Sequence, residues 1–308
     1  MSCSYATTHF EAAASGHGEP RADEHARIKE YYRAVAQDFR AWSPKLNMHF
    51  GYWDWNINPM HREDMLERMN TEVLNRLNLP PTRPLLLADL GCGAGATART
   101  IAQRRVETTI DAVTVVMEQI LQGAELSHAI GLRHKVKFRL ADYTDTRLPA
   151  AQYDGVYALE SACHARGADK RPLLREMFRL LKPGGRLVIV DAFLRTPAPL
   201  PGLVDRIYRS WCRNWVISEL AEISAMRDSL ADQGFIDVKA DEITWRIAPS
   251  ALQIPFFATW FAIRELWRTR LRMNSWRIGH ILASYASFLM GCWLPGFGYY
   301  VVTATKPG

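Results

Sequence analysis

The sequence predicts an α/β fold, with a mostly parallel sheet of seven strands and helices on both faces. Three observations lead to this prediction. Short runs of β-branched and aliphatic residues alternate with segments of helical periodicity through the middle of the chain. A glycine-rich turn follows the first of these runs, and a KPGG turn precedes the fifth. The chain has 308 residues, 48% of them hydrophobic and 23% charged, which suits one large globular domain and excludes a disordered or fibrous chain.

The individual elements follow from periodicity and from the turn residues that bound them. The expected strands are residues 85–90, 109–116, 135–140, 153–158, 186–193, 235–243 and 299–305. The expected helices are residues 25–39, 60–77, 97–104, 118–130 and 170–181, with mostly helical sequence over 201–233 and 249–294. Pro80, Pro81 and Pro84 end the second helix, because proline cannot continue one.

We expect a disordered tail at the N-terminus, because its residues are mainly small and polar. The rest of the chain is expected to form a single domain. The expected divisions are the tail (1–24), the domain (25–308), its aromatic N-terminal segment (25–80), its sheet core (85–195), a mostly helical segment (200–297) and the last strand (298–308).

Charge and cysteine usage limit the classes of partner. The formal net charge is +6, which is compatible with an anionic ligand but far below the basic footprint of a nucleic-acid-binding protein. No signal-peptide pattern and no run of about 18 apolar residues is present, so no transmembrane segment is expected. None of the five cysteines lies at metal-ligand or redox-motif spacing. We therefore expect reduced thiols, no metal site and a cytoplasmic protein.

A glycine loop follows the first expected strand. In the run ADLGCGAGAT, Asp89 precedes Gly91, Gly93 and Gly95. Glycines at the end of a strand let the backbone approach a ligand at the carboxyl edge of a parallel sheet. The spacing G-x-G-x-G differs from the dinucleotide fingerprint G-x-G-x-x-G. The alternative is a tight strand-to-helix turn that binds nothing.

Four motifs, in this order, resemble those of the class I S-adenosylmethionine-dependent methyltransferases. They are the glycine loop, the loop Ala141–Tyr143, the turn Leu181–Gly185 and a closing pair of strands over 232–244 and 298–306. The resemblance covers roughly residues 28–243 and 298–305. It implies a Rossmann-like fold that binds S-adenosylmethionine, with residues 25–80 as a lid over the cofactor and 200–297 as a cap over the substrate.

The resemblance also implies which residues hold the cofactor. Asp89 and the three glycines of the loop belong to this set. Many family members place an acid after the second strand, but this chain has Thr114 there and Gln119 five residues later. That spacing resembles cyclopropane-synthase-like and prenyl-diphosphate methyltransferases, and a hydroxyl and an amide can hydrogen-bond a ribose diol. The alternative for Thr114 is a strand residue that faces the core.

The loop after the third strand is expected to hold the adenine. Asp142 would accept a hydrogen bond from the exocyclic amine, and Tyr143 would pack on the ring. The alternative for Asp142 is a turn residue at the end of a strand.

The run YALESACHAR after the fourth strand resembles the sterol C-methyltransferases, and the prenyl-diphosphate C-methyltransferases also place a glutamate here. Methylation of an alkene carbon forms a carbocation, which a buried carboxylate can stabilise and then deprotonate. Glu160 is the first candidate for this role and His164 the second. The alternatives are a loop acid that only orients the cofactor or the backbone, and a polar residue at a helix entry.

The N-terminal segment is rich in aromatic residues, and its run HFGYW resembles the lids of tocopherol-type and sterol-type methyltransferases. Aromatic faces attract a sulfonium or a carbocation, and they exclude water. Tyr32 and His49 are the catalytic candidates of this lid. The alternative is hydrophobic packing without an electronic role.

The mostly helical segment adds apolar and basic residues. Its tryptophans and phenylalanines, among them Trp211, Trp215 and Phe257, suit an isoprenoid-like substrate. Arg264 and Arg268 lie one helical turn apart, so they could clamp a diphosphate. The alternative is a solvated or membrane-facing basic surface, which would allow peripheral membrane contact. This segment does not match the sterol enzymes closely.

Three functions are therefore open. The first is a C-methyltransferase of natural product biosynthesis that acts on a hydrophobic isoprenoid-type molecule. The second is an O- or N-methyltransferase of an aromatic or amine natural product, which needs only proximity and one base. The third is a non-catalytic scaffold. Nucleic acid is not an expected substrate, and the sequence leaves homo-oligomer formation open.

Overall fold

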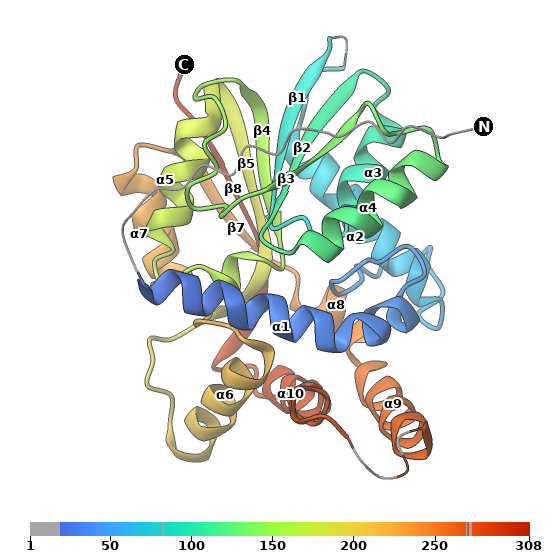
Figure 1. Ribbon diagram of the computed structural model, residues 1–308. Coiled ribbons are helices and arrows are strands. Elements are labelled where there is room, and N and C mark those ends of the chain that lie inside the picture. Colours follow the sequence, from blue (N-terminus) through green and yellow to red (C-terminus); the bar gives the residue numbers. More distant parts are fainter. Residues whose placement is uncertain (1–18, 82, 269, 271–272) are drawn as a thin grey trace, which may run out of the picture.

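The computed structural model describes residues 19–308 except 82, 269, 271 and 272. Most of the expected N-terminal tail, residues 1–18, therefore lies outside the described residues. Figure 1 shows a central sheet with helices on both faces and a further layer of helices below the carboxyl ends of the parallel strands.

The sheet confirms the predicted α/β fold with its seven strands. They are β1 (Leu85–Leu90), β2 (Thr108–Thr114), β3 (Val136–Leu140), β4 (Tyr153–Leu159), β5 (Leu181–Leu194), β7 (Ile236–Glu242) and β8 (Phe297–Thr305). Their order is β3-β2-β1-β4-β5-β8-β7, and β8 runs antiparallel to both of its neighbours. The sequence did not predict the two-residue strand β6 (Ala221–Glu222), which pairs with β5.

β5 begins earlier than predicted. Leu181 already pairs with Tyr153 on β4, and regular pairing resumes at Arg186 after a register shift. The predicted turn Lys182–Gly185 therefore lies inside the strand as an irregularity, where Gly184 takes a positive φ of 74°.

The helices follow the predicted order with changed bounds. They are α1 (Glu19–Trp42), α2 (Arg62–Leu77), α3 (Ala96–Arg104), α4 (Met117–Ala129), α5 (Arg171–Leu180), α6 (Gly202–Trp215), α7 (Ile223–Asp232), α8 (Thr244–Ala251), α9 (Ile254–Arg268) and α10 (Ser275–Cys292). None of the helices in the described part of the chain is long and apolar enough to cross a bilayer.

Two of these helices correct the sequence analysis. Residues 19–24, expected in the tail, form the first turns of α1, because the Glu24 carboxylate accepts from Ser218 Oγ at 2.5 Å and pairs with Arg166 at 2.7 Å. The expected helical stretch 201–233 breaks after α6, where Val216 takes a left-handed φ of 53°. The break leads the chain into β6 before α7 begins.

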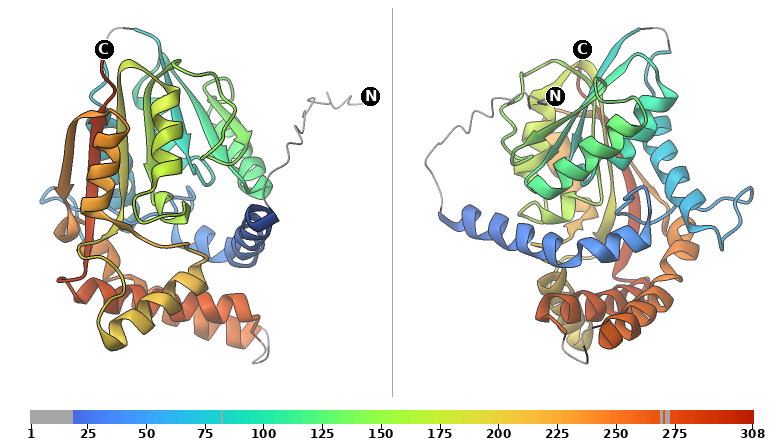
Figure 2. Two further views of the ribbon diagram at one scale, coloured as in Figure 1. Left: turned by 90° about the vertical axis from the view of Figure 1, so that its left-hand side faces the viewer. Right: turned by 45° about the vertical axis from the view of Figure 1, so that its right-hand side comes forward.

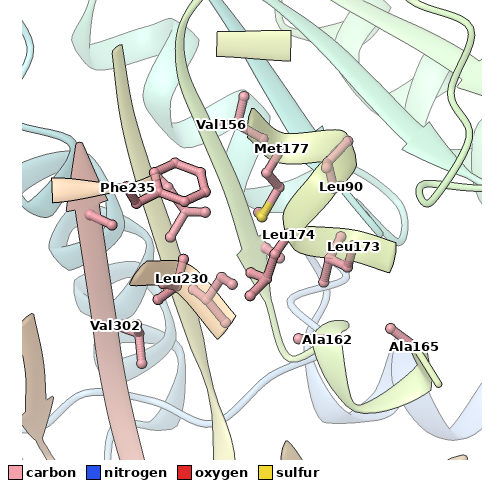
Figure 3. Packing of buried hydrophobic residues seen from close by; sticks show 14 of the residues in the cluster. Leu90, Val156, Ala162, Ala165, Leu173, Leu174, Met177, Leu230, Phe235 and Val302 are labelled. Atoms are coloured by element: carbon pink, nitrogen blue, oxygen red, sulfur yellow. The ribbon is translucent and has the colours of Figure 1, made fainter. Parts of the chain in front are cut away.

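Each face of the sheet is covered by its own apolar cluster. Leu173, Leu174 and Met177 of α5 and Leu230 of α7 pack on one face (Figure 3). On the other face, residues of α2 and α3 pack against the inner strands, with Ile101 fully buried. Burial of both faces explains why the inner strands are apolar along their whole length.

The lower layer consists of α1, α6, α9 and α10. Figure 1 shows α1 crossing the sheet at its carboxyl edge, and both views in Figure 2 place α6, α9 and α10 farther from the sheet. A buried ion cluster joins three of these helices. Arg277 of α10 pairs with Glu265 of α9 at 2.7 Å and donates a hydrogen bond to Asp38 of α1. All three side chains are less than a tenth exposed.

We predict that Arg277→Met lowers the free energy of unfolding by about 3–5 kcal/mol, because it leaves the buried Asp38 carboxylate without its cation. Arg264→Met is the control, since Arg264 lies over the rings of Trp260 and Phe261 and makes no hydrogen bond to Asp38 in the described structure, so it is expected to change stability by about 1 kcal/mol or less. Denaturant unfolding followed by tryptophan fluorescence measures both. A loss below about 1 kcal/mol for Arg277→Met would show that the cluster contributes little.

Candidate active site

The glycine loop connects β1 to α3 in a conformation that requires its glycines. Gly91, Gly93 and Gly95 have φ values of 84°, 52° and 74°, in the left-handed region that glycine tolerates. A Cβ atom on Gly91 would lie 2.3 Å from the Cβ of Ser161. One on Gly95 would lie 2.7 Å from the Phe138 ring, so this glycine allows close packing between α3 and β3.

A cavity lies beside this loop at the carboxyl edge of the sheet, and we call it the cofactor cavity. Its wall contains all predicted site residues except Gly95 and Asp142. The predicted residues in the wall are Tyr32, His49, Asp89, Gly91, Gly93, Thr114, Gln119, Tyr143, Glu160 and His164. Residues scattered over the sequence from α1 to the loop after β4 therefore meet at one place.

Asp142 does not line this cavity, and its carboxylate lies close to α1. Its carboxylate accepts from the backbone and hydroxyl of Thr144 at 2.8 and 2.7 Å, and lies 3.4 Å from His25 of α1. Burial raises the pKa of Asp142, but the hydrogen bonds from His25 and Thr144 outweigh it and bring the pKa to about 2. The predicted adenine acceptor therefore holds α1 against the core in this structure.

Thr114 and Gln119 lie side by side in the wall of this cavity. The Thr114 hydroxyl donates to Gln119 Oε1 at 2.8 Å, and both side chains are buried. Gln119 Nε2 reaches only Met48 Sδ, at 4.0 Å, so the amide keeps donors for a ligand. Asp89 is also buried, which raises its pKa to about 7 against the lowering effect of the Tyr157 hydroxyl. These groups fit the hydroxyls of a ribose.

Glu160 ends β4 with a left-handed φ of 48°, a conformation that is costly for a residue with a side chain. Its carboxylate accepts from the Phe50 backbone N–H at 2.6 Å and from the Tyr299 hydroxyl. Burial, and to a lesser extent the negative charge of Asp191, raise the pKa of Glu160 to about 8, although the two hydrogen bonds lower it. The carboxyl group is therefore mostly protonated at neutral pH.

Asp191 is a second buried acid at this edge. It lies on β5, next to the end of β4, where Glu160 N donates to Val190 O at 2.8 Å. Its carboxylate accepts from the backbone N–H groups of Cys163 and Ala192 at 3.0 and 2.8 Å. Burial raises the pKa of Asp191 to about 6, against these two hydrogen bonds.

His164 follows β4 and has one ring nitrogen that can accept a proton. Its Nδ1 lies 2.9 Å from the carbonyl oxygen of Val216, which can only accept, so Nδ1 carries the proton. Nε2 is then an acceptor and lies 3.3 Å from the hydroxyl of Tyr32. Burial lowers the pKa of His164, which keeps the ring neutral near pH 7.

His49 has a different environment. Its Nδ1 lies 2.9 Å from the Phe50 carbonyl, and its Nε2 lies 3.0 Å from Asn70 Oδ1 and 3.3 Å from Asn47 Oδ1. Asn70 also accepts from Thr97 of α3 at 2.7 Å. Both ring nitrogens thus belong to a network of polar contacts that joins the loop between α1 and α2 to the helices α2 and α3.

Two further cavities lie next to the cofactor cavity, toward the lower layer. The first chamber, of about 160 Å³, shares Tyr32, Met48, His49, Glu160 and His164 with the cofactor cavity. The second chamber, of about 370 Å³, lies among α6, α8, α10 and β8. It shares Phe50, Ala192, Trp211, Trp215, Ile254 and Tyr299 with the first chamber. The predicted apolar substrate space between the lid and the cap is present.

The described walls of both chambers contain no lysine or arginine. Arg264 lies 4.9 Å from the centre of the Trp260 ring, and Arg268 pairs with Glu265 at 2.8 Å. The two arginines therefore do not form the predicted diphosphate clamp, because their helix turns its buried face, and not theirs, toward the first chamber. Arg272 lies outside the described residues.

The sequence analysis missed Tyr299 and Asp191, which both line the first chamber. Since β8 is antiparallel to β5, its first residues lie beside the carboxyl end of β5. The closing pair of strands predicted over 232–244 and 298–306 was thus a signal that could have placed Tyr299 at the site. Asp191, near the end of the predicted fifth strand, could have been found by the same rule that found Glu160.

Comparison with known proteins agrees with this geometry. A family model described as "Methyltransferase domain" matches residues 88–189, which span the glycine loop through β5. An O-methyltransferase of Pyrenophora dematioidea is 33% identical over 66% of this chain and 73% of its own length. The 27-O-demethylrifamycin SV methyltransferase of Amycolatopsis mediterranei is 27% identical over 85% of this chain and 90% of its own.

One solved structure of similar fold is a geranyl diphosphate C-methyltransferase from Streptomyces coelicolor A3(2) in complex with Mg²⁺, geranyl diphosphate and S-adenosyl-L-homocysteine. It has a TM-score of 0.67 and 16% identity, and the match covers 92% of this chain and 98% of the other. From the domain match, the sequence relatives and the cavity beside the glycine loop, we conclude that this chain belongs to the S-adenosylmethionine-dependent methyltransferases and is an enzyme of that family.

Proposed function

We propose that the protein transfers the methyl group of S-adenosylmethionine to a hydroxyl oxygen of an uncharged, hydrophobic small molecule. The observation that carries this proposal is the position of His164. Its unprotonated Nε2 accepts a long hydrogen bond of 3.3 Å from Tyr32, and His164 lines both the cofactor cavity and the apolar first chamber. A hydroxyl bound in that chamber would have a base within reach and the methyl donor on the other side.

The chemistry needs few groups. The substrate oxygen attacks the methyl carbon, the carbon–sulfur bond breaks, and S-adenosylhomocysteine leaves as a neutral thioether. The hydroxyl proton passes to Nε2 of His164, which is neutral and therefore able to accept it. The Tyr32 hydroxyl, which lies 3.3 Å from the same nitrogen, turns away as the substrate hydroxyl takes its place. The aromatic walls exclude water, which would compete for the base.

The walls also indicate the class of substrate. Two neighbouring apolar cavities with shared wall residues suit a hydrophobic substrate. The described walls of the two chambers contain carboxyl groups but no lysine or arginine side chain. A diphosphate or a carboxylate would be buried there without a cation from the wall, which disfavours such substrates. Relatives named as O-methyltransferases support oxygen as the methyl acceptor.

A second candidate function is C-methylation of an isoprenoid double bond. Glu160 favours it, because a buried carboxyl group among Tyr32, Phe50 and Tyr299 could stabilise a carbocation and then remove a proton. In this mechanism Glu160 must be ionised. The positive sulfonium of the cofactor would lower the pKa of this carboxyl group and promote its ionisation.

The cofactor would be held by the groups around the glycine loop. Thr114 and Gln119 would bind the ribose, and Tyr143, whose hydroxyl donates to the Ser161 carbonyl at 2.8 Å, would pack against the adenine. Asp142 remains a prediction as the adenine acceptor, and it could serve only after its contact with His25 loosens.

The direct test is product analysis. The enzyme is incubated with S-adenosylmethionine carrying a ¹³C-methyl group and with hydrophobic substrates that contain both a hydroxyl and a double bond. The chemical shift of the transferred methyl group distinguishes a methyl ether from a methyl on carbon. We expect the methyl ether.

We predict that His164→Gln lowers kcat by about 10²–10⁴, the range typical of a lost general base, while the affinity for the cofactor stays unchanged. Glu160→Gln is expected to cost less than about tenfold, because Glu160 does not take up the proton in O-methylation and glutamine has the same shape. The reverse order of the two losses would support C-methylation instead.

We predict that Glu160→Gln stabilises the protein, and increasingly so between pH 5 and pH 8. The pKa of Glu160 is about 8 in the folded protein against an ordinary 4.5, so in this range the folded state binds a proton that the unfolded state lacks. Stability therefore falls as the pH rises, by roughly 1.4 kcal/mol per unit of pKa difference, and the variant removes this loss. Denaturant unfolding across the pH range measures it, with Glu107→Gln at an exposed site as the control. If the difference in the free energy of unfolding between Glu160→Gln and the wild type did not change with pH, the raised pKa of Glu160 would be contradicted.

We predict that Gln119→Leu weakens binding of S-adenosylmethionine by roughly tenfold, because the ribose loses a hydrogen bond worth about 1.5 kcal/mol. Isothermal titration calorimetry measures the affinity. Gln103→Leu, on the exposed side of α3, is the control. Equal affinities for the two variants would place the ribose elsewhere.

A further inference from the structure

The outward face of α9 carries a stripe of large apolar residues. Phe256, Trp260, Ile263 and Trp267 follow one another at intervals of four, three and four residues, which places them on one side of the helix. Each is between 49% and 84% exposed. A helix on the surface of a protein in water normally turns charged and polar residues outward.

The opposite side of α9 is the one that packs inward. Its buried residues are Ile254, Ala258, Phe261 and Glu265. The helix is therefore apolar on two opposite sides, and one of them has no cover within the described chain. Exposed apolar stretches of this kind mark surfaces that dock on something.

α10 repeats the pattern. Ile278, Leu282, Tyr285 and Leu289 follow the same intervals of four, three and four residues. Its three aliphatic members are 41–58% exposed. The hydroxyl groups of Thr259 and Tyr285 form an exposed hydrogen bond of 2.6 Å between the two helices. Since Thr259 lies beside the α9 stripe, the two stripes meet there, and we call them together the outer apolar surface.

The charges around this surface are positive. The guanidinium of Arg264 lies 4.9 Å from the Trp260 ring, and Arg268 and Arg270 are exposed at the end of α9. Glu265 is the only acid in α9 and α10, and it is buried. The whole chain carries a net charge of +6. Exposed tryptophan and arginine around an apolar stripe suit the interface of an anionic lipid bilayer.

The mouth of the second chamber borders the same surface. Trp245, Leu252 and Cys292 line this chamber and are exposed, so the chamber opens to the outside at these residues. Leu252 lies four residues before Phe256, in the turn between α8 and α9, and Cys292 lies three residues after Leu289. Both stripes thus end beside the opening. Figures 1 and 2 show α9 and α10 in the layer farthest from the sheet, where a flat surface could reach them.

We propose that the outer apolar surface docks the protein on an anionic membrane surface, with the mouth of the second chamber turned toward the lipid. A hydrophobic substrate would then enter the second chamber from the bilayer without crossing water. Docking goes beyond the proposed function and does not depend on which atom is methylated. A second copy of the chain fits this surface less well, because the exposed arginines would face one another with no exposed acid on either helix.

The test is flotation of the full-length protein with vesicles of phosphatidylcholine and phosphatidylglycerol at a ratio of 7:3, and with vesicles of phosphatidylcholine alone. No substrate is added, so failure of docking is distinguishable from failure of the proposed reaction. The test variant is Ile263→Glu with Trp267→Glu. The control is Val106→Glu with Leu121→Glu, which changes the net charge equally at residues that are 69% and 64% exposed and lie outside α9 and α10.

We expect the wild type and the control to float with the phosphatidylglycerol vesicles, more weakly in 0.5 M salt, and the test variant to bind at least about tenfold less. Equal binding by the test and control variants, or no binding by the wild type, would overturn the proposal. So would a wild-type dimer in analytical ultracentrifugation that the test variant dissociates, because the surface would then be a protein interface.

Discussion

The structure depends on the exclusion of water from the carboxyl edge of the sheet. α1 crosses this edge, and its contacts reach both the core, through His25 and Asp142, and the cap, through Asp38 and Arg277. Under this helix two acids, Glu160 and Asp191, lie buried beside His164. In a low dielectric their charges and dipoles act strongly on a sulfonium, which makes the closed lid a requirement of the chemistry and not only of stability.

The same exclusion explains why the groups of the site carry unusual protonation states. Burial raises the pKa of each acid and lowers that of the histidine, so all of them are held closer to neutral than in water. A neutral site can admit an apolar substrate without displacing strongly bound water. The positive cofactor then becomes the main charge in the site, and its binding sets the ionisation of the acids around it.

Much of the fold could be predicted from local patterns, because glycine loops, strand runs and helix stops involve neighbours in sequence. The positions of Asp89, Thr114, Gln119 and Glu160 followed from the rule that strand ends share one edge. The hydrogen bond from Tyr299 to Glu160, 139 residues away, could not be predicted, because it depends on the register of β8 against β5. The predicted diphosphate clamp of Arg264 and Arg268 is not formed. Helical spacing shows which residues share a face of the helix, but it does not show what that face packs against.

The position of β8 has a consequence for the order in which the protein forms during synthesis. β8 lies between β5 and β7, so no hydrogen bonds join these two strands to a common sheet until residues 297–305 have left the ribosome. Until then β5 presents an open, apolar edge, and β7 has no partner in the sheet. The nascent chain must therefore hold an unfinished sheet until β8 emerges, an aggregation-prone stage at which a chaperone would have its greatest effect.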